Sequence, residues 1–562
     1  MPLLRNTFLT LALLVAAGAC SGGGGVAAPA PAPSPAPAPP PVSGAVASRP
    51  HEAAPPLPAI PLVDGPLAIR VVYPSPNQTI TSRDSNFIFG SVGSGRASLT
   101  INGVPVPVYP NGAFTAYLAN PSATAPKYDI VASRGTDSVS HTLNIRYPVV
   151  AARPAVVPPA TKPENLPTSR ADTIAALNSR IDSLRTQLSR NDPIGIAQLG
   201  QPAAADSDIT IYGKPIVAGT YKWFFTPGTL VPVVGRVPGA VRVRLDDQLD
   251  VFVDSADARD APAGATLPRR TLSNMRVRAT STGADVIMPI GAKAPYFVEE
   301  GDRSISVTLY GVRGNTDIIN YASDDSLVRT VEWSQLGSER TRVTVNLHNA
   351  PYGYLVLWEN NSLVLKLRGR PAIVSARPLA GLTIAVDPGH PPIGATGPTG
   401  LYEGNATLMI GQRVQRMLEE RGATVIMTRT TEAPVALGDR PIIARRANAH
   451  AFVSIHLNAY PDGVNPFVNN GTGTYFFRTH SEPLAREVQR TLVAQLGLRD
   501  LGVNYDNLAV VRSTWYPAVL CEGAFLMIPE QEAALRTPEF QDRYARGVVD
   551  GLENYFRNLA NR

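Results

Sequence analysis

The chain has 562 residues, which is too long for one hydrophobic core and indicates several domains. Apolar residues make up 44% and charged residues 17% of the sequence, as in ordinary globular proteins. The net charge of +6 is spread over many residues without a dense run of Lys or Arg, so the composition predicts no nucleic-acid partner. The 53 prolines, about twice the average share, concentrate near residues 29–60 and 154–167 and indicate linkers there.

The N-terminal stretch predicts an export signal. One charge, at Arg5, precedes an apolar run over residues 7–19 that is too short for a permanent membrane span. The run ends in small residues directly before Cys20 and resembles a bacterial lipobox. This resemblance implies that residues 1–20 are a lipoprotein signal peptide and that Cys20 is lipidated. Ordinary signal cleavage is the alternative, because Ala17 stands where leucine is usual.

A Pro- and Ala-rich segment, residues 21–65, cannot form a core and predicts a disordered tether. Ser21 after the cysteine resembles lipoproteins sorted to the outer membrane. We therefore expect an exported protein on the periplasmic side, held at the outer membrane by a lipid anchor. The second cysteine, Cys521, has no partner for an internal disulfide.

Two kinds of segment follow the tether. Residues 66–150 contain short alternating segments with turn signals, of which Asn102-Gly103 is a strong hairpin signal. They predict a small β-sandwich that loosely resembles Ig-like modules. Residues 151–204 predict a linker with an amphipathic helix over 172–190, which either packs on a neighbouring domain or pairs two chains.

Two further strand-rich segments are expected to dock the protein rather than to catalyse. Residues 205–270 predict an SH3-like β module, and residues 271–372 resemble an AMIN-like β module. Large aromatic side chains in these segments are expected in the cores more often than on a ligand platform. They are Trp223, Phe224, Trp333 and Trp358.

From residue 379 to 562 strands alternate with helices. Such alternation predicts an α/β domain with a mainly parallel sheet and helices on both faces. The sequence as a whole therefore predicts a multidomain protein with all-β modules before a C-terminal α/β domain. In parallel sheets the functional site lies beyond the carboxyl ends of the strands.

Three chemically active residues stand at predicted strand ends. His390 follows "TIAVDPG", His456 closes "FVSIH" and Glu522 closes "AVLCE". A fourth, Glu403, lies thirteen residues after His390, just before a predicted helix. Taken singly, such a histidine is more often a satisfied loop residue, and a glutamate that opens a helix usually complements the helix dipole.

Taken together, these residues meet one chemical requirement. Two imidazoles and one carboxylate make a three-ligand zinc site with a fourth position for water. A second carboxylate beside that water can take its proton and pass it to a leaving amine. Two cysteines cannot build a Cys₄ zinc site, Cys20 and Cys521 lack the close spacing of a Cys₂His₂ site, and the sequence lacks a His-Glu-x-x-His helix.

The C-terminal motifs resemble the catalytic domain of a zinc-dependent N-acetylmuramoyl-L-alanine amidase of the Amidase_3 type. The matching stretches include "TIAVDPGH", "GATGPTGLYEGNATL", "RGATVIMTRT" and "YPAVLCEGAFLMIPE", in order across 380–560. Carried over to this chain, the resemblance implies His390, Glu403 and His456 as Zn²⁺ ligands and Glu522 as the catalytic carboxylate. The family usually has Gly-Gly after its first histidine, where this chain has a shorter loop with two prolines.

Asn458 and Arg440 also fall on family motif positions, where each either orients substrate or caps a turn. The resemblance implies hydrolysis of the amide between N-acetylmuramic acid and L-alanine in peptidoglycan, for cell-wall remodelling or daughter-cell separation. Envelope or divisome proteins are candidate regulators. The competing hypotheses are a non-catalytic, envelope-anchored peptidoglycan-binding scaffold and a zinc peptidase that acts within stem peptides.

Overall fold

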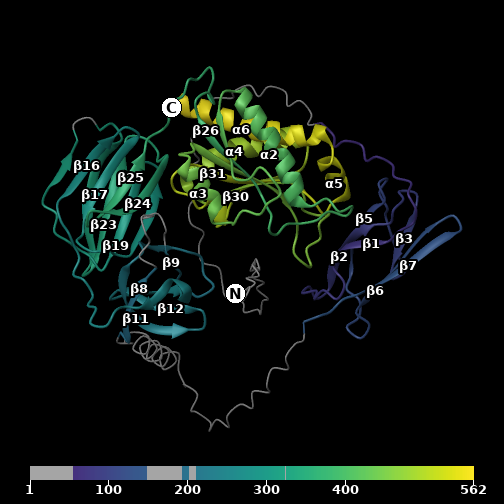
Figure 1. Cartoon of the computed structure of the whole chain (residues 1–562), viewed down its shortest axis with the longest axis horizontal. Helices are drawn as coiled ribbons and strands as arrows, with labels where there is room; N and C mark the ends of the chain where they lie inside the picture. Colours follow the sequence, from purple (N-terminus) through teal and green to yellow (C-terminus); the bar gives the residue numbers. More distant parts are fainter. Residues whose placement is uncertain (1–54, 149–192, 201–210, 323–324, 562) are drawn as a thin grey trace, which may run out of the picture. The chain divides into compact units, whose positions relative to one another are not determined.

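The computed structural model describes residues 55–148, 193–200, 211–322 and 325–561 (Figure 1). The predicted signal peptide with Cys20, the predicted helix over 172–190 and most of the predicted tether lie outside these residues. Within the described part of the chain, no helix has the length and apolar character that crossing a membrane requires.

Residues 55–148 form two antiparallel sheets, in the strand orders β1-β2-β5 and β4-β3-β6-β7. Ile88 and Phe114 from the first sheet and Ile101 and Tyr128 from the second are fully buried in one core, as a sandwich requires. The Ig-like assignment itself stays a prediction. The strands are β1 (Arg70–Tyr73), β2 (Ser85–Ser91), β3 (Ser98–Ile101), β4 (Val104–Val106), β5 (Ala113–Ala119), β6 (Lys127–Arg134) and β7 (Asp137–Asn144).

The hairpin predicted at Asn102-Gly103 is confirmed. Both residues have positive φ, 50° and 79°, and they join β3 to β4 as an antiparallel pair. A two-residue turn with positive φ at both positions matches the right-handed twist of the strands, which explains the preference for Asn and Gly.

The described residues between 193 and 370 are built mainly from β-sheets. One five-stranded sheet has the order β13-β12-β11-β8-β14, and a six-stranded sheet, β22-β23-β19-β18-β10-β9, shares an apolar core with a second five-stranded sheet, β21-β16-β17-β25-β24. The strands are β8 (Gly195–Leu199), β9 (Ile211–Gly213), β10 (Trp223–Phe225), β11 (Thr229–Val237), β12 (Ala240–Asp246), β13 (Leu249–Asp254), β14 (Ala258–Asp260), β15 (Thr271–Leu272), β16 (Met275–Thr280), β17 (Gly283–Pro289), β18 (Tyr296–Gly301), β19 (Ser304–Tyr310), β20 (Arg313–Gly314), β21 (Ile319–Tyr321), β22 (Val328–Gly337), β23 (Arg340–Leu347), β24 (Gly353–Glu359) and β25 (Ser362–Arg368), with a 3₁₀ turn η1 (Ser255–Asp257).

Two strands of this region change the expected division of the chain. Strand β8 lies inside the expected linker 151–204 and pairs with β11, so the strand-rich region begins before residue 205. Strand β10 pairs with β18, which joins the segments 205–270 and 271–372 in one sheet. Trp223 in β10 is buried and donates a hydrogen bond to the hydroxyl of Tyr310, as expected for a core residue.

The C-terminal domain is an α/β domain with the strand order β27-β26-β28-β31-β29-β30, coloured green to yellow in Figure 1. Strands β27, β26, β28 and β31 are parallel, and β29 is antiparallel to β31, so the predicted mainly parallel sheet is confirmed. The elements are β26 (Thr383–Pro388), α2 (Glu403–Glu420), β27 (Thr424–Met427), α3 (Asp439–Arg446), β28 (Ala451–Asn458), β29 (Thr472–Phe476), η2 (Thr479–Ser481), α4 (Glu482–Leu496), β30 (Asp500–Tyr505), η3 (Ala509–Val511), β31 (Ala518–Phe525), α5 (Pro529–Leu535) and α6 (Pro538–Ala560).

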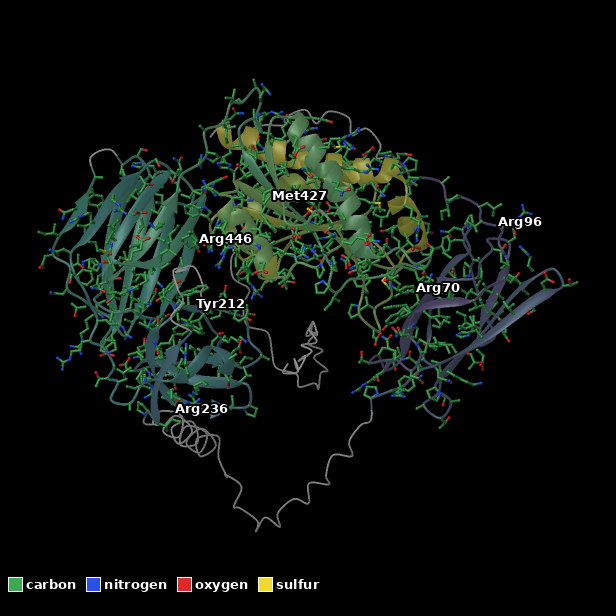
Figure 2. The ribbon with its side chains drawn as sticks, viewed as in Figure 1. Arg70, Arg96, Tyr212, Arg236, Met427 and Arg446 are labelled. Atoms are coloured by element: carbon green, nitrogen blue, oxygen red, sulfur yellow. The ribbon has the colours of Figure 1, made fainter. Side chains whose placement is uncertain are left out.

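Apolar side chains cover both faces of this sheet, because successive residues of a strand point to opposite sides. Ile384 and Val386 of β26 are buried with α2, α4 and α6, while Ala385 between them is buried with α3 and η3. Helices therefore cover both faces, with the longer helices on one. Met427 at the end of β27, labelled in Figure 2, packs against the core that contains Ile384 and Val386.

Candidate functional site

The four candidate residues come from three neighbouring strands and one helix. His390 lies two residues beyond the carboxyl end of β26, and His456 and Glu522 lie near the carboxyl ends of β28 and β31. Glu403 is the first residue of α2. Because β26, β28 and β31 are adjacent and parallel, their carboxyl ends meet at one edge of the sheet.

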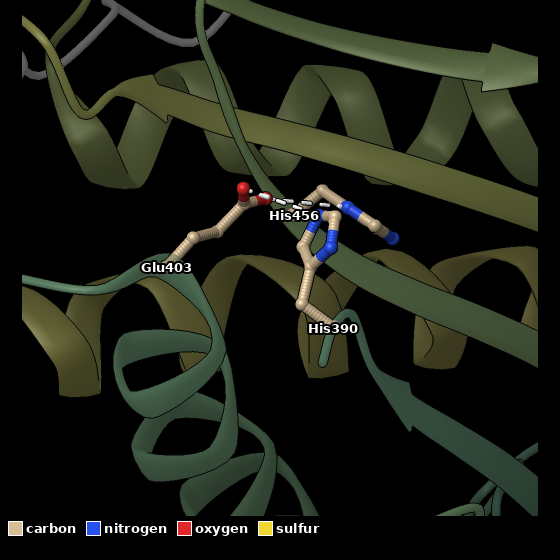
Figure 3. A group of neighbouring side chains, drawn as sticks. All are labelled: His390, Glu403 and His456. Atoms are coloured by element: carbon tan, nitrogen blue, oxygen red, sulfur yellow. Dashed lines mark ion pairs between the residues drawn. The ribbon is translucent and has the colours of Figure 1, made fainter. Parts of the chain in front are cut away.

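His390, Glu403 and His456 point toward one another at this edge (Figure 3). His390 Nε2 lies 3.1 Å from Glu403 Oε2, and His456 Nδ1 lies 3.3 Å from Glu403 Oε1. The two imidazole rings are 4.9 Å apart between centroids and nearly perpendicular, at 79°. One ligand atom from each residue lies within 4.8 Å of the other two, so a single metal ion fits between them.

The two histidines approach different oxygens of the Glu403 carboxylate, Oε2 for His390 and Oε1 for His456. Two imidazole nitrogens and one carboxylate are a donor set that suits zinc. The side chains of His390 and His456 are 23% and 16% exposed, whereas that of Glu403 is 5% exposed. The two histidines therefore form the side of the site that faces solvent.

The Glu403 carboxylate is held in the charged form. Burial alone would raise its pKa, but hydrogen bonds and charge interactions with His390 and His456 outweigh burial and lower the pKa below its ordinary value. Its oxygens also accept from the backbone N–H groups of Ala395, at 2.9 Å, and Leu457, at 3.0 Å. These contacts fix the orientation of the carboxylate, as expected for a metal ligand.

The pKa of Glu522 is shifted in the opposite direction from that of Glu403. Burial, together with the nearby negative charge of Glu403, raises the pKa of the Glu522 carboxyl well above its ordinary value. Its Oε2 atom is closed off from solvent without a hydrogen-bond partner among the described residues. A carboxyl oxygen that has no hydrogen-bond partner can exchange a proton with a neighbouring water molecule.

The backbone before His390 allows close approach to His456. A Cβ atom on Gly389 would lie 2.4 Å from Cε1 of the His456 ring, so any larger residue here would displace the ring or the loop. His390 itself has a φ of 57°, in the left-handed region that costs a non-glycine residue about 1–2 kcal/mol. Such a conformation persists only where the surrounding contacts determine it.

The loop between His390 and Glu403 is anchored by Glu532 of α5. This buried carboxylate accepts hydrogen bonds from Thr399 N at 2.8 Å, Thr399 Oγ1 at 2.9 Å and Leu401 N at 3.0 Å. A carboxylate that receives several such bonds stabilises a loop that lacks regular structure. Sequence reasoning missed Glu532, because it lies in the short helix α5, which the sequence did not predict.

Arg440 lies in α3 with its guanidinium buried. Its Nη1 donates to Asp387 Oδ1 at 2.8 Å and to Pro388 O at 2.9 Å, and its Nη2 donates to Pro391 O at 2.9 Å. Its Nε donates to Val435 O at 3.3 Å. All three nitrogens therefore have acceptors within the protein. Of the two roles expected for Arg440, this geometry favours holding a turn over contacting substrate.

Other polar residues of the domain divide between the site and the scaffold. Asn458 lies two residues after His456 on β28, beside Tyr475, and its role in substrate orientation stays a prediction. His450 accepts a hydrogen bond from Thr383 N at 2.9 Å, and His480 pairs with Glu300, so both are structural. Cys521 is buried and free, with no disulfide.

The fold and the site together define an α/β enzyme domain with a candidate metal centre at the carboxyl edge of its sheet. Residues 384–554 match the family model of N-acetylmuramoyl-L-alanine amidase. The chain is 32% identical over 208 residues to the uncharacterized protein YqiI of Bacillus subtilis (strain 168), which covers 36% of this chain and 98% of YqiI. This chain belongs to the N-acetylmuramoyl-L-alanine amidase family.

Two further relatives carry the family name. The chain is 36% identical over 186 residues to N-acetylmuramoyl-L-alanine amidase LytC of Bacillus subtilis (strain 168), which covers 32% of this chain and 36% of LytC. It is 32% identical to a crystal structure of N-acetylmuramoyl-L-alanine amidase from Clostridium difficile 630, over 31% of this chain and 96% of that chain, with a TM-score of 0.29. The chain thus spans about a third of the length of LytC.

Proposed function

We propose that the chain is a peptidoglycan hydrolase that cleaves the amide bond between N-acetylmuramic acid and the L-alanine of the stem peptide. One observation carries the proposal. His390, Glu403 and His456 converge beside Glu522, the carboxyl with a raised pKa and a free oxygen. The membership of residues 384–554 in the amidase family supports the substrate class.

The donor set fits zinc, because two imidazole nitrogens and one carboxylate are the ligands of many catalytic zinc sites. His390, Glu403 and His456 would hold the ion. When bound, zinc lowers the pKa of water towards roughly 7 and polarises a carbonyl oxygen.

The residues of the chain supply the proton transfers. Glu522 accepts a proton from the attacking water as that water adds to the lactyl carbonyl carbon. The protonated Glu522 then gives the proton to the L-alanine nitrogen as the C–N bond breaks, and the stem peptide leaves with a free amine. Burial, and next the negative charge of Glu403, raises the pKa of Glu522, which favours its holding the proton between the two steps.

The setting of this reaction is the cell envelope. The lipid anchor at Cys20, export to the periplasmic side and docking of the β modules to wall or partner proteins are our predictions for how the chain reaches peptidoglycan. They account for a catalytic domain that makes up about a third of the chain and follows a long Pro-rich segment.

Product analysis tests the proposal. The purified full-length chain is incubated with peptidoglycan sacculi in the presence of zinc or of a chelator, and the soluble products are identified by mass spectrometry. We expect zinc-dependent release of intact stem peptides that begin with a free L-alanine amine. The Glu522→Gln variant, prepared in parallel, should release none.

The same assay separates the competing hypotheses. Cleavage inside the stem peptide, with no free L-alanine amine, would identify a zinc peptidase instead. Binding of the chain to sacculi without release under any metal condition would identify a peptidoglycan-binding scaffold. Either result would reject the amidase assignment.

A further inference from the structure

Arg429, two residues after β27, lies beside the metal centre with its side chain almost completely buried. Its Nε donates to Pro388 O at 2.8 Å, and its Nη2 donates to Gly389 O at 2.9 Å. These two carbonyls precede His390 directly. The guanidinium therefore binds the backbone that carries the first candidate ligand.

The Nη2 atom of Arg429 also contacts helix α2, which begins at Glu403. Arg429 Nη2 donates to Gly404 O at 2.6 Å and to Thr407 Oγ1 at 3.1 Å, both in the first turns of α2. Thr407 Oγ1 in turn donates to Gly389 O at 2.7 Å. One guanidinium thus links the residue before His390 to the residue after Glu403.

Arg429 carries a positive charge and binds backbone carbonyls rather than a carboxylate. Burial, and next the positive charge of Arg440, lowers the pKa of Arg429 to about 10, so it is still charged at neutral pH. The nearby buried carboxylate, Asp387, is bound by Arg440, Ser454 and Thr428. Arg429 therefore binds backbone carbonyls, and its planar guanidinium offers five N–H donors on three nitrogens, where a lysine offers three on one nitrogen.

The hydrogen bonds of Arg429 and Arg440 surround a residue with an unfavourable backbone conformation, His390. His390 has a φ of 57°, in the left-handed region, which is unfavourable for a non-glycine residue. Arg440 binds the carbonyls of His390 and Pro391, while Arg429 binds those of Pro388 and Gly389. Two guanidinium groups thus bind four consecutive carbonyls around His390, and these hydrogen bonds stabilise the unfavourable backbone conformation.

We propose that Arg429 is a positioning residue for the metal site, which holds His390 and Glu403 at the separation that a metal ion requires before the ion binds. The inference rests on the proposed function, because it assumes that these residues are metal ligands. Groups outside the ligand set that orient ligands commonly change metal affinity 10- to 100-fold when they are replaced.

Zinc affinity, measured by competition with a chromophoric chelator, tests this on the full-length chain. We expect Arg429→Gln to raise the zinc dissociation constant 10- to 100-fold, with Arg429→Lys in between. The absorption spectrum of the Co²⁺-substituted protein should change in Arg429→Gln, because the arrangement of ligands around the ion changes.

Arg543 in α6 is the matched control. It is also buried and donates to backbone carbonyls, those of Gln495 at 2.7 Å and Leu496 at 2.9 Å, away from the ligands. Arg543→Gln should lower the melting temperature without a change in zinc affinity. A zinc dissociation constant for Arg429→Gln within twofold of wild type, or an equal loss in Arg543→Gln, would overturn the inference.

If Arg429→Gln does not fold, two milder variants at Thr407 test the inference. Thr407→Val removes the hydroxyl that connects Arg429 to Gly389, and Thr407→Ser keeps it. Zinc binding at least threefold weaker in Thr407→Val than in Thr407→Ser supports the inference, and equal binding overturns it. Absence of zinc binding in the wild-type chain would instead refute the proposed metal site itself.

Discussion

His456 on β28 and Glu522 on β31 are register partners on adjacent parallel strands. Neighbouring strands are about 4.8 Å apart, and residues paired in register point to the same face of the sheet. A candidate metal ligand and the candidate proton acceptor therefore stand side by side by virtue of strand pairing alone. This pairing places Glu522 beside His456, one of the three converging residues.

Replacement of Glu522 should separate catalysis from metal binding. We expect Glu522→Gln to lower kcat by 10²- to 10⁴-fold, because the amide cannot accept the proton of the attacking water. Zinc affinity should stay within about threefold of wild type, since Glu522 is not one of the three converging ligands. The assay measures peptide release from sacculi alongside zinc content. Glu420→Gln, an exposed change on α2, should behave as wild type, and turnover in Glu522→Gln near the wild-type rate would contradict the role.

Metal removal should lower stability only when the ligand set is intact. When the free zinc concentration is a thousand times the dissociation constant for the folded chain, zinc binding adds about 4 kcal/mol to the free energy of unfolding. We therefore expect a chelator to lower the melting temperature of the wild-type protein, and added zinc to restore it. His456→Ala should show neither change, whereas the exposed His348→Ala should respond as wild type. A melting temperature of the wild type that is independent of zinc would argue against the site.

The glycine before His390 should be irreplaceable. In Gly389→Ala the new Cβ would meet the His456 ring at 2.4 Å, so either the ring or the loop must move. We expect zinc affinity to fall at least tenfold. Gly438→Ala is the matched change, because a Cβ there meets nothing within 4 Å and its φ of −71° suits alanine. Retained zinc affinity in Gly389→Ala would show that the His456 ring can adjust.

His450 should give the domain a pH-dependent stability. Burial first, and then the charge of Arg368, lowers the pKa of His450 from 6.5 to about 4. The unfolded chain therefore binds a proton more readily between these values, so the stabilisation is complete above about pH 6.5 and is lost as pH falls towards 4. Since the side chain is only half-buried, solvent screens part of the effect, and we expect a loss of about 1–2 kcal/mol.

An asparagine at this position tests the assignment. His450→Asn keeps an acceptor for Thr383 N but cannot take up a proton, so urea unfolding at pH 7 and pH 4.5 should show a smaller difference in free energy than in wild type. An unchanged difference would assign the pH dependence to other groups.

Much of the α/β domain could be predicted because its signals are local. The sequence predicts helices over 482–496 and 538–559, and the structure has α4 over the first range and α6 over the second to within one residue. Strand β30 and helix α5 were not predicted. Strand β30 is only partly buried and has a mixed polar pattern, and α5 is too short for a clear helical periodicity.

The sequence by itself determined where the strands of the C-terminal sheet approach their carboxyl ends, since apolar runs and Gly or Pro punctuation are local properties. This was enough to single out His390, His456 and Glu522. The predicted ends at His456 and Glu522 were early, because β28 continues to Asn458 and β31 to Phe525. Tertiary structure alone decided that Glu403, thirteen residues after His390, turns back to meet both histidines, and that Arg429 and Glu532 hold the loop between them. These contacts depend on long-range packing of loops and on buried charge, and no spacing in the chain encodes them.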